Sequence, residues 1–348
     1  MNQKIVNLRA LAILFIVLGH SIIIYDHSFK LLSTQVEMPL FETLKHWISF
    51  VQLKLFFSIS GFLMFYKVLK WHKRTLREIW AGMCNFMSNK FLRLLIPYAC
   101  VALLWMDPIK IVLDIPDYSW SIDLMLQQVR FENCGHLWYL PCLFFIFLFM
   151  YILLSVVHNS LFGHIILLSV LMVLNYKHTI FTEIFQLQNV AYYMVFFYLG
   201  YLINYIGTYM DKIKQFVVPP PHLSMLNGKY SICFKSTIVL LIFILIFVLG
   251  YLINLFTSIG FEFYASFILV IMFYYLMPAF KNSIVNEISN RSYGIYLFHS
   301  PMIYITAELC PNINPWLMLF INLIVFGGIA YFISVSLSLT KFKFVIGS

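Results

Sequence analysis

The sequence has little charge, and acidic residues are especially scarce. Only 11% of its 348 residues are charged, with 14 Asp and Glu against 23 Lys and Arg, whereas 62% are hydrophobic and 19% aromatic. Water-soluble domains carry about twice that share of charged residues. The composition excludes an ordinary soluble protein and indicates a chain that crosses a membrane several times.

Other absences narrow the class further. The six cysteines show no C-x-x-C or Cys/His metal spacing, so we predict no metal site. Cys134 and Cys310 are both expected on the outer side, where a disulfide is an alternative in an oxidising compartment, but unpaired thiols are the favoured interpretation. No hydrophilic segment is long enough for a soluble domain, and there is no internal repeat. Residues 1–348 are therefore predicted to form a single integral membrane domain.

Apolar runs that approach or reach bilayer length, about 17 to 25 residues, recur along the chain. They lie at 6–26, 43–66, 91–106 (extending to about 113), 137–157, 164–175, 189–206, 236–256, 261–280, 293–309 and 316–339. We predict an all-α, polytopic transmembrane helix bundle of about ten spans.

The charges that remain are distributed asymmetrically. Lys and Arg gather at 67–93, 212–235 and the C-terminal end, whereas Asp and Glu gather at 107–132, Glu183 and Glu308. Basic residues accumulate in cytoplasmic loops, so both termini are predicted to be cytoplasmic. Most of the net charge of +9 is explained by this orientation and calls for no nucleic-acid partner.

Two ionisable residues, Arg9 and His20, lie inside the first apolar run. An ionisable side chain in hydrocarbon is costly and is a functional hypothesis by default. The step between them turns a helix through about 1100°, which leaves them about 20° apart in azimuth and about 16 Å apart along the axis. One face of the helix therefore carries both.

Basic residues within the predicted spans have few acidic partners. Arg9, His20, Lys54 and His299 are basic, and almost no Asp or Glu accompanies them. Because buried positive charge requires a negative partner, an anionic ligand is expected. Phosphate groups suit Arg and Lys well.

Five segments, in order along the chain, resemble the integral membrane acyltransferase 3 family. They are 8–20 with its R-x10-H spacing, 55–63 (LFFSISGFL), 89–98 (NKFLRLLIPY), 136–141 (HLWYLP) and 292–301 (SYGIYLFHSP). Two departures from the family pattern stand out. Lys90 replaces the first Arg of an R-x-x-R stretch, and Lys54 takes a place that is usually uncharged. Lys90 keeps the charge but loses the planar guanidinium fork, and Lys54 is left without an assigned role.

The resemblance implies an enzyme that takes an acyl group, often acetyl, from coenzyme A and places it on a hydroxyl of a sugar or lipid-linked glycan. Acyl-CoA would be a co-substrate, and no cofactor would be tightly bound. The setting it implies is a lipid bilayer, the bacterial cytoplasmic membrane. The acceptor glycan, the acyl group and the oligomeric state are left open.

Residue roles follow by position from that resemblance. Arg9, Lys90 and Arg93 would hold the phosphates of the cofactor near the cytoplasmic face. His20 would be catalytic, either as general base on the acceptor hydroxyl or as a transient carrier of the acyl group. Each of these residues has a structural alternative. His20 could tether two helices, Arg9 could extend its side chain to the lipid headgroups, and Lys90 and Arg93 could be ordinary basic residues of a cytoplasmic loop.

Four more residues are candidates for a substrate cavity. Ser60, next to Gly61, either contacts substrate or allows close helix packing, which is the favoured reading. Trp138 and Tyr139 either stack on a sugar or belong to an interfacial aromatic belt. His299 either lines the cavity or bonds a neighbouring helix.

Two other functions compete with the enzyme. A transporter or flippase of a glycan precursor would show paired broken helices in matching halves, and the sequence shows no such pairing. A non-enzymatic subunit of a polysaccharide synthesis complex is the other, and Arg9, His20 and the basic pair argue against it.

Overall fold

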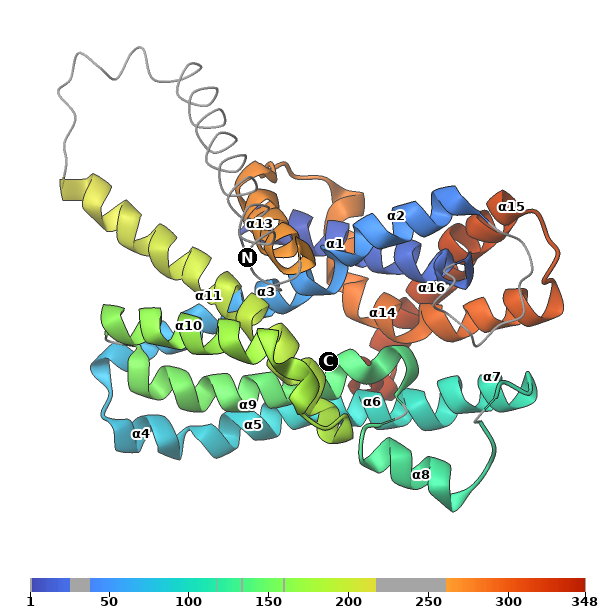
Figure 1. Ribbon diagram of the computed structural model, residues 1–348, viewed down its shortest axis with the longest axis horizontal. Coiled ribbons are helices and arrows are strands. Elements are labelled where there is room, and N and C mark those ends of the chain that lie inside the picture. Colours follow the sequence, from blue (N-terminus) through green and yellow to red (C-terminus); the bar gives the residue numbers. More distant parts are fainter. Residues whose placement is uncertain are drawn as a thin grey trace, which may run out of the picture.

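The structure is a computed structural model that describes residues 2–25, 38–116, 118–132, 134–158, 160–216 and 261–347. The described residues are helical and include no strand. Most helices run roughly along the long axis of the molecule (Figure 1). The all-α fold class is confirmed.

The helices fall into four stretches of chain. The first holds α1 (Gln3–Ser21), η1 (Ile23–Tyr25), α2 (Pro39–Ser49), α3 (Gln52–Val68) and η2 (Leu69–Lys73). The second holds α4 (Leu76–Ala81), α5 (Met83–Lys90), η3 (Phe91–Leu95), α6 (Ile96–Val101), η4 (Ala102–Met106), α7 (Asp107–Val112) and α8 (Ile122–Val129). The third holds η5 (Gly135–Trp138), α9 (Tyr139–Val157), α10 (Leu161–Tyr176), η6 (His178–Ile180), η7 (Ile184–Gln186) and α11 (Leu187–Phe216). The last holds α13 (Phe261–Leu276), α14 (Ser283–Leu309), α15 (Pro315–Phe320), η9 (Ile321–Phe326), α16 (Gly327–Ser338) and η10 (Lys341–Ile346).

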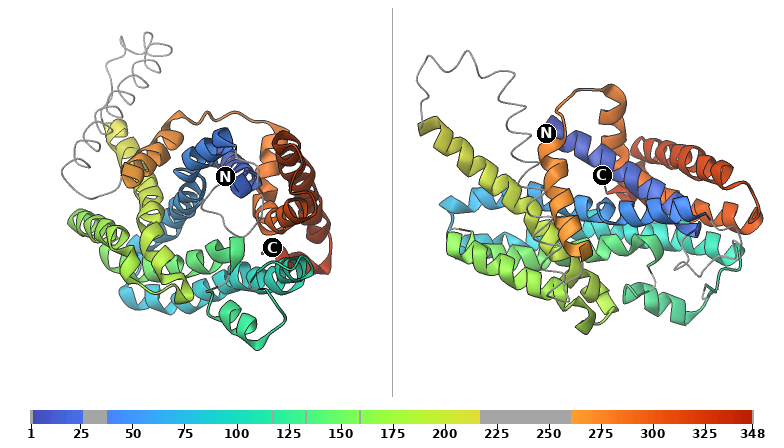
Figure 2. Two further views of the ribbon diagram at one scale, coloured as in Figure 1. Left: turned by 45° about the vertical axis from the view of Figure 1, so that its right-hand side comes forward. Right: turned by 45° about the horizontal axis from the view of Figure 1, so that its top comes forward.

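Helix α1 packs against both α3 and α14, which brings the two ends of the chain together (Figure 2). Its buried side includes Leu8, Ala12 and Ile16 at helical spacing. Helix α14 also packs on α16, and α3 packs along α11. The helix that carries Arg9 and His20 is therefore enclosed by helices from both halves of the sequence.

Six helical stretches in the described residues are long and apolar enough to cross a membrane. They are Gln3–Ser21, Pro39–Trp71, Leu76–Val112, Gly135–Val157, Ile184–Thr208 and Pro315–Ser338. Two of the other expected spans correspond to the shorter apolar helices α10 and α13, and the expected span at 293–309 lies within α14. The span expected at 236–256 lies outside the described residues. Ten spans and the orientation of the termini remain predictions.

The run expected as one helix from residue 43 to 66 is broken, because α2 ends at Ser49 and α3 begins at Gln52. Lys54 stabilises the break between the two helices. Its ammonium donates to the Ser49 carbonyl at 3.0 Å and lies about 6 Å from the rings of Phe50 and Phe196. A cation at a helix C-terminus satisfies carbonyls that have no helical partner, so the structure gives Lys54 a capping role.

Close packing of α3 on α11 depends on two glycines. A Cβ at Gly61 would overlap the carbonyl of Phe197, and a Cβ at Gly200 would overlap the carbonyl of Ser58. Small residues allow membrane helices to approach this closely. The packing interpretation of the Ser60–Gly61 segment therefore fits Gly61.

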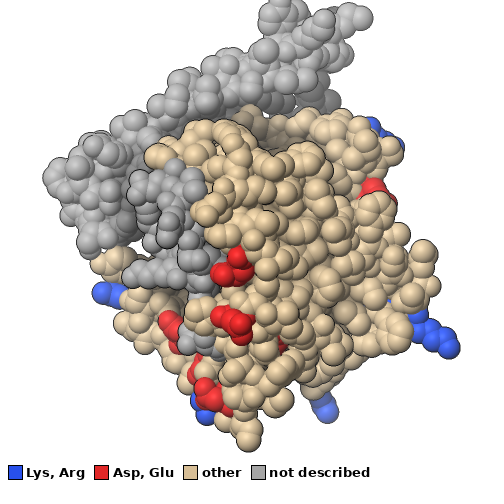
Figure 3. All heavy atoms as spheres, turned by 90° about the vertical axis from the view of Figure 1, so that its right-hand side faces the viewer, with Lys and Arg blue, Asp and Glu red and all other residues tan. Residues whose placement is uncertain are grey.

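Acidic side chains gather at one end of the molecule, the end formed by α7 and α8 (Figure 3). Among the exposed acids there are Asp114 and Asp123. The basic residues Lys67, Lys90 and Arg93 instead surround the opposite end of α1, beside Arg9. This separation is the one expected from the charge pattern of the loops.

Candidate functional site

Two imidazoles from opposite ends of the chain meet in the core. His20 at the end of α1 and His299 in α14 have ring centroids 5.0 Å apart and nearly parallel, with Nδ1 of His20 2.8 Å from Nε2 of His299. His299 is completely buried. Of the two alternatives for His299, the structure shows the bond to a neighbouring helix, made to His20, the residue expected to be catalytic. His299 lines neither of the two cavities described below.

The proton positions in this pair follow from backbone carbonyls. Nδ1 of His299 lies 2.8 Å from the carbonyl oxygen of Ile295 and 3.0 Å from that of Tyr296. A carbonyl oxygen only accepts, so Nδ1 carries the proton and, in the neutral ring, Nε2 is an acceptor. His20 then donates from Nδ1 to His299. The remaining nitrogen of His20, Nε2, holds a basic lone pair.

A third histidine that sequence reasoning did not assign, His136 in η5, completes the cluster. Its ring centroid lies 6.4 Å from that of His20 and 6.0 Å from that of His299. Its Nε2 donates to the carbonyl of Leu297 at 3.1 Å. That carbonyl lacks its helical i+4 donor because residue 301 is proline. The signal was present in the sequence, as a histidine at the start of HLWYLP and a proline two residues after His299.

Two of the three imidazoles, those of His20 and His136, border a cavity of about 160 Å³. His20, His136 and Trp138 line it, together with Ile23, Ile24, Gly135, Ser300, Ile303 and Tyr304. Helices α1 and α14 and the short helices η1 and η5 supply these residues. Trp138 and Tyr304 are the aromatic side chains in this lining, so the cavity joins a basic nitrogen to flat apolar surfaces.

A second cavity, of about 400 Å³, lies around Arg9. Its described lining includes four cations, Arg9, Lys67, Lys90 and Arg93, and no carboxylate. The other lining residues are Ser60, Leu63, Met64, Phe86, Leu94, Leu143, Phe147, Asn290, Tyr293, Ile346 and Gly347. Four cations around one cavity favour a multiply charged anion. The structure thus brings Arg9, Lys90 and Arg93 together, and adds Lys67.

Individual contacts hold the cations in that cavity. The ammonium of Lys90 lies 3.6 Å from the centroid of the Phe147 ring, which is cation–π distance. Nε of Arg93 donates to the carbonyl of Gly347 at 3.0 Å, and the Tyr293 hydroxyl donates to the carbonyl of Arg93 at 2.8 Å. The C-terminal turn therefore forms one wall of the cavity.

Tyr139 lies between the two cavities. Its hydroxyl hydrogen-bonds to Ser60, which lines the cationic cavity. Its ring lies 5.5 Å from that of Tyr296, which in turn packs 5.8 Å from the His136 ring. Both tyrosines are buried. Tyr139 therefore separates and links the two groups of predicted residues and does not line the imidazole cavity beside Trp138.

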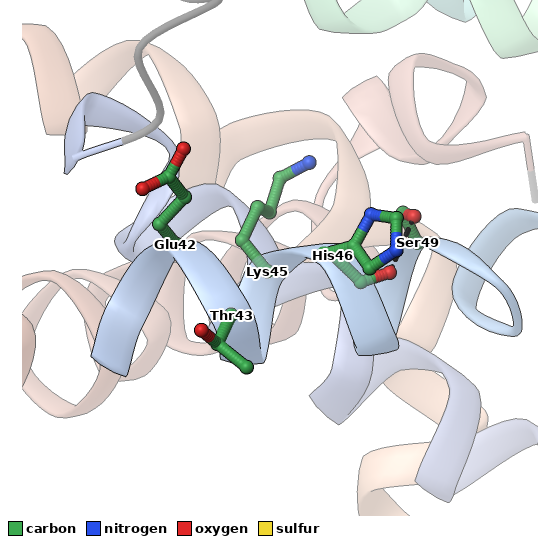
Figure 4. Close-up of a pocket in the computed structure, with 5 residues that line it drawn as sticks. All are labelled: Glu42, Thr43, Lys45, His46 and Ser49. Carbon is green, nitrogen blue, oxygen red and sulfur yellow. Dashed lines mark hydrogen bonds between the residues drawn. The ribbon is translucent and has the colours of Figure 1, made fainter. Parts of the chain in front are cut away.

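A third depression, of about 350 Å³, shares no lining residue with these two cavities. The five side chains that line it, Glu42, Thr43, Lys45, His46 and Ser49, all come from α2 (Figure 4). Because all of these side chains come from one helix, the depression does not bring together groups from different parts of the chain. The cavity beside His20 is smaller, but four separate elements, α1, η1, η5 and α14, converge on it.

A family model for an acyltransferase domain, acyltransferase 3, covers residues 2–340. The chain belongs to the acyltransferase 3 family. Searches of curated proteins and of solved structures find nothing that matches.

Membership makes the protein a membrane acyltransferase, with an acyl donor and an acceptor. The predicted site residues of the acyltransferase lie in two groups. At the imidazole cavity are His20, Trp138 and, bonded to His20, His299. At the cationic cavity are Arg9, Lys90, Arg93 and Ser60. Cys134 and Cys310 are both free thiols, and Cys134 contacts the Tyr98 hydroxyl at 3.2 Å. The unpaired interpretation therefore holds and the disulfide alternative does not.

Proposed function

We propose that this acyltransferase moves an acyl group, in the first instance acetyl, from coenzyme A to a hydroxyl of a sugar in a cell-surface or lipid-linked glycan. The observation that carries the proposal is the placement of a cationic cavity and a basic imidazole cavity at the two ends of one helix, α1. A phosphate-bearing thioester has the same division, with its charge at one end and its reactive carbon at the other.

At the donor end, Arg9, Lys90 and Arg93 would hold the phosphates, with Lys67 as a fourth cation. Guanidinium groups bind phosphate through paired hydrogen bonds, whereas ammonium groups act as point charges. The cofactor arm would then extend along α1 for about 16 Å to reach His20. On this path it must pass Tyr139 and Tyr296.

At the reacting end, Nε2 of His20 would act on the acyl carbon or on the attacking hydroxyl. As general base it would take the proton of the acceptor hydroxyl, and as nucleophile it would carry the acyl group between two half-reactions. Both roles require the neutral ring with its lone pair on Nε2. The bond from His20 to His299 selects that tautomer.

The acceptor would enter from the side of the imidazole cavity that Trp138 and Tyr304 line. Aromatic faces suit the apolar faces of sugar rings, and the cavity offers few charged groups. The proposed partners are therefore an acyl-CoA, a carbohydrate or glycolipid acceptor and the bilayer, with the bacterial cytoplasmic membrane as the proposed location.

A labelling experiment tests the proposal. The full chain, reconstituted in lipid nanodiscs, is supplied with acetyl-CoA that carries 14C in its acetyl group, and with envelope vesicles from cells that lack this chain. We expect alkali-labile label in the glycan fraction, and a loss of at least a hundredfold in His20→Ala. His178→Ala is the matched control, because the Nδ1 of His178 is likewise a donor, to the carbonyl of Asn175 at 2.7 Å, but His178 lines neither cavity.

Two results would count against the enzyme. Labelling that His20→Ala leaves unchanged removes the assigned catalytic residue. Uptake of a glycan precursor by proteoliposomes in the absence of acetyl-CoA would instead favour the transporter.

A further inference from the structure

We propose that His136 is a second catalytic imidazole, which binds the acceptor hydroxyl and takes its proton, so that His20 is left to carry the acyl group. This inference rests on the proposed function and deepens it. The observation behind it is a buried nitrogen of His136 that has no hydrogen-bond partner in the described part of the chain, although the other ring nitrogen is held by a backbone carbonyl.

The backbone of α14 fixes the orientation and the tautomer of His136. Its Nε2–H donates to the Leu297 carbonyl, whose usual helical donor is missing because residue 301 is proline. The hydroxyl of Tyr296 donates to the backbone carbonyl of His136. With the proton on Nε2, the lone pair of the neutral ring lies on Nδ1.

That lone pair has no hydrogen-bond partner among the described residues. Buried polar atoms are nearly always paired, and one left unpaired is costly, so its persistence at a cavity requires an explanation. A ligand hydroxyl is a suitable donor. His136 lines the same cavity of about 160 Å³ as His20, and the two ring centroids lie 6.4 Å apart.

The two histidines differ in what lies behind them. Behind His20 stands another imidazole, His299, whose Nε2 can receive a proton across 2.8 Å. Behind His136 stands a backbone carbonyl, which cannot receive one. His20 is thus able to lose its Nδ1 proton when Nε2 forms a covalent bond, whereas His136 gains a proton at Nδ1 and keeps the one at Nε2.

The transfer balances in two steps. In the first, Nε2 of His20 attacks the thioester carbon, the C–S bond breaks, coenzyme A leaves as the thiolate and the Nδ1 proton passes to His299. In the second, the acceptor O–H gives its proton to Nδ1 of His136 while the oxygen bonds to the acyl carbon. The bond from that carbon to His20 breaks, and His299 returns the proton to Nδ1. His136 finally releases its proton to water, and the thiolate takes one up.

The test separates the two half-reactions. His136→Gln keeps an N–H that can reach the Leu297 carbonyl but removes the basic lone pair. Without acceptor, exchange of label between [14C]-CoA and acetyl-CoA reports the first step; with the envelope vesicles described above, alkali-labile label reports both. We expect His136→Gln to keep at least half of the exchange and to lose at least a hundredfold of the transfer, in line with general-base effects of about 10² to 10⁴.

Several outcomes would overturn the inference. The first is that His136→Gln transfers acetyl to the glycan at half the wild-type rate or more. The second is that His136→Gln loses the exchange reaction together with the transfer. The third is that the wild-type protein shows no exchange. Where His136→Gln does not give a monodisperse protein, His136→Ala replaces it: loss of transfer that added imidazole restores supports the inference, and wild-type transfer contradicts it. Transfer that depends on His20 but not on His136 leaves the proposed function intact, whereas transfer independent of both removes it.

Discussion

The two cavities beside α1 are built in different ways. The cationic cavity has about 400 Å³ and draws its charge from side chains on α1, α3, α5 and η3. The imidazole cavity has about 160 Å³, and backbone carbonyls of the single helix α14 hold two of its three neighbouring rings. A binding site for a flexible anion needs charge of one sign, whereas a site for proton transfer needs fixed proton positions.

Both cavities nevertheless use proline in the same way. Pro301 leaves the Leu297 carbonyl without its helical donor, and that carbonyl accepts from His136. Pro97 cannot donate to the carbonyl of Arg93, and that carbonyl accepts from the Tyr293 hydroxyl at 2.8 Å. A helix interruption thus becomes an anchor point for a side chain of the site.

The largest effect is expected when the His299 ring, which sets the tautomer of His20, is removed. We expect His299→Phe to lower kcat about 10² to 10⁴-fold, the range found when a catalytic histidine loses the group that orients it. The KM for acetyl-CoA should stay within about threefold, because His299 does not line the cationic cavity. Steady-state kinetics in nanodiscs measure both constants. An unchanged kcat would mean that another group fixes the proton of His20.

The complementary change acts on binding alone. Arg93→Gln removes one guanidinium from the cationic cavity, and hydrogen bonds to charged groups contribute about 1.5 to 3 kcal/mol. We therefore expect the KM for acetyl-CoA to rise about 10 to 100-fold with kcat unchanged. The same KM should rise with salt in the wild-type protein and rise less in the variant.

Arg291→Gln is the matched control for that experiment. Arg291 is paired with Glu287 at 2.9 Å, one turn away on the surface of α14, and does not line the cavity. Its removal should change the KM less than twofold. A fall in kcat for Arg93→Gln with an unaltered KM would contradict the division of labour between the cavities.

How much of this arrangement the sequence could predict differs between the two cavities. Arg9, Lys90 and Arg93 were predictable because charge in a mostly apolar sequence is rare, and helical spacing showed which face Arg9 shares with His20. Lys67 was hidden among ordinary cytoplasmic basic residues. The helical fold class was equally accessible from composition.

The imidazole cavity was harder to predict. His20 and His299 were candidates, but their bond joins residues 279 positions apart, and no local pattern encodes that distance. His136 belongs to the HLWYLP segment, but its partner is a backbone carbonyl, and the sequence does not show backbone hydrogen bonds. The break at Ser49 and the π-turns at Phe91–Leu95 and Ala102–Met106 were also missed, since they interrupt continuous apolar runs.

A change at the close contact between α3 and α11 should lower the stability of the helix bundle. Gly61→Ala and Gly200→Ala each force a methyl group against a backbone carbonyl of the facing helix, and overpacking of this kind costs about 1 to 3 kcal/mol. We expect a lower midpoint of thermal unfolding in nanodiscs for both variants. Gly207→Ala on the same helix α11 meets nothing within 4 Å and should not lower it. Equal midpoints for all three would show that the helices are not in such close contact.

The smallest expected effect concerns Lys90, where the family pattern has arginine. Lys90→Arg places a planar guanidinium over the Phe147 ring, which lies 3.6 Å from the present ammonium, and such a group both stacks on aromatic rings and binds phosphate through two hydrogen bonds. If this position contacts the cofactor, the KM for acetyl-CoA should fall about two to fivefold while kcat stays constant. Lys70→Arg, which lies outside the cavity lining, is the control for added guanidinium. An increase in KM for Lys90→Arg would show that this position requires the compact ammonium, and that the departure from the family pattern is an adaptation of the binding cavity rather than a weakened copy of it.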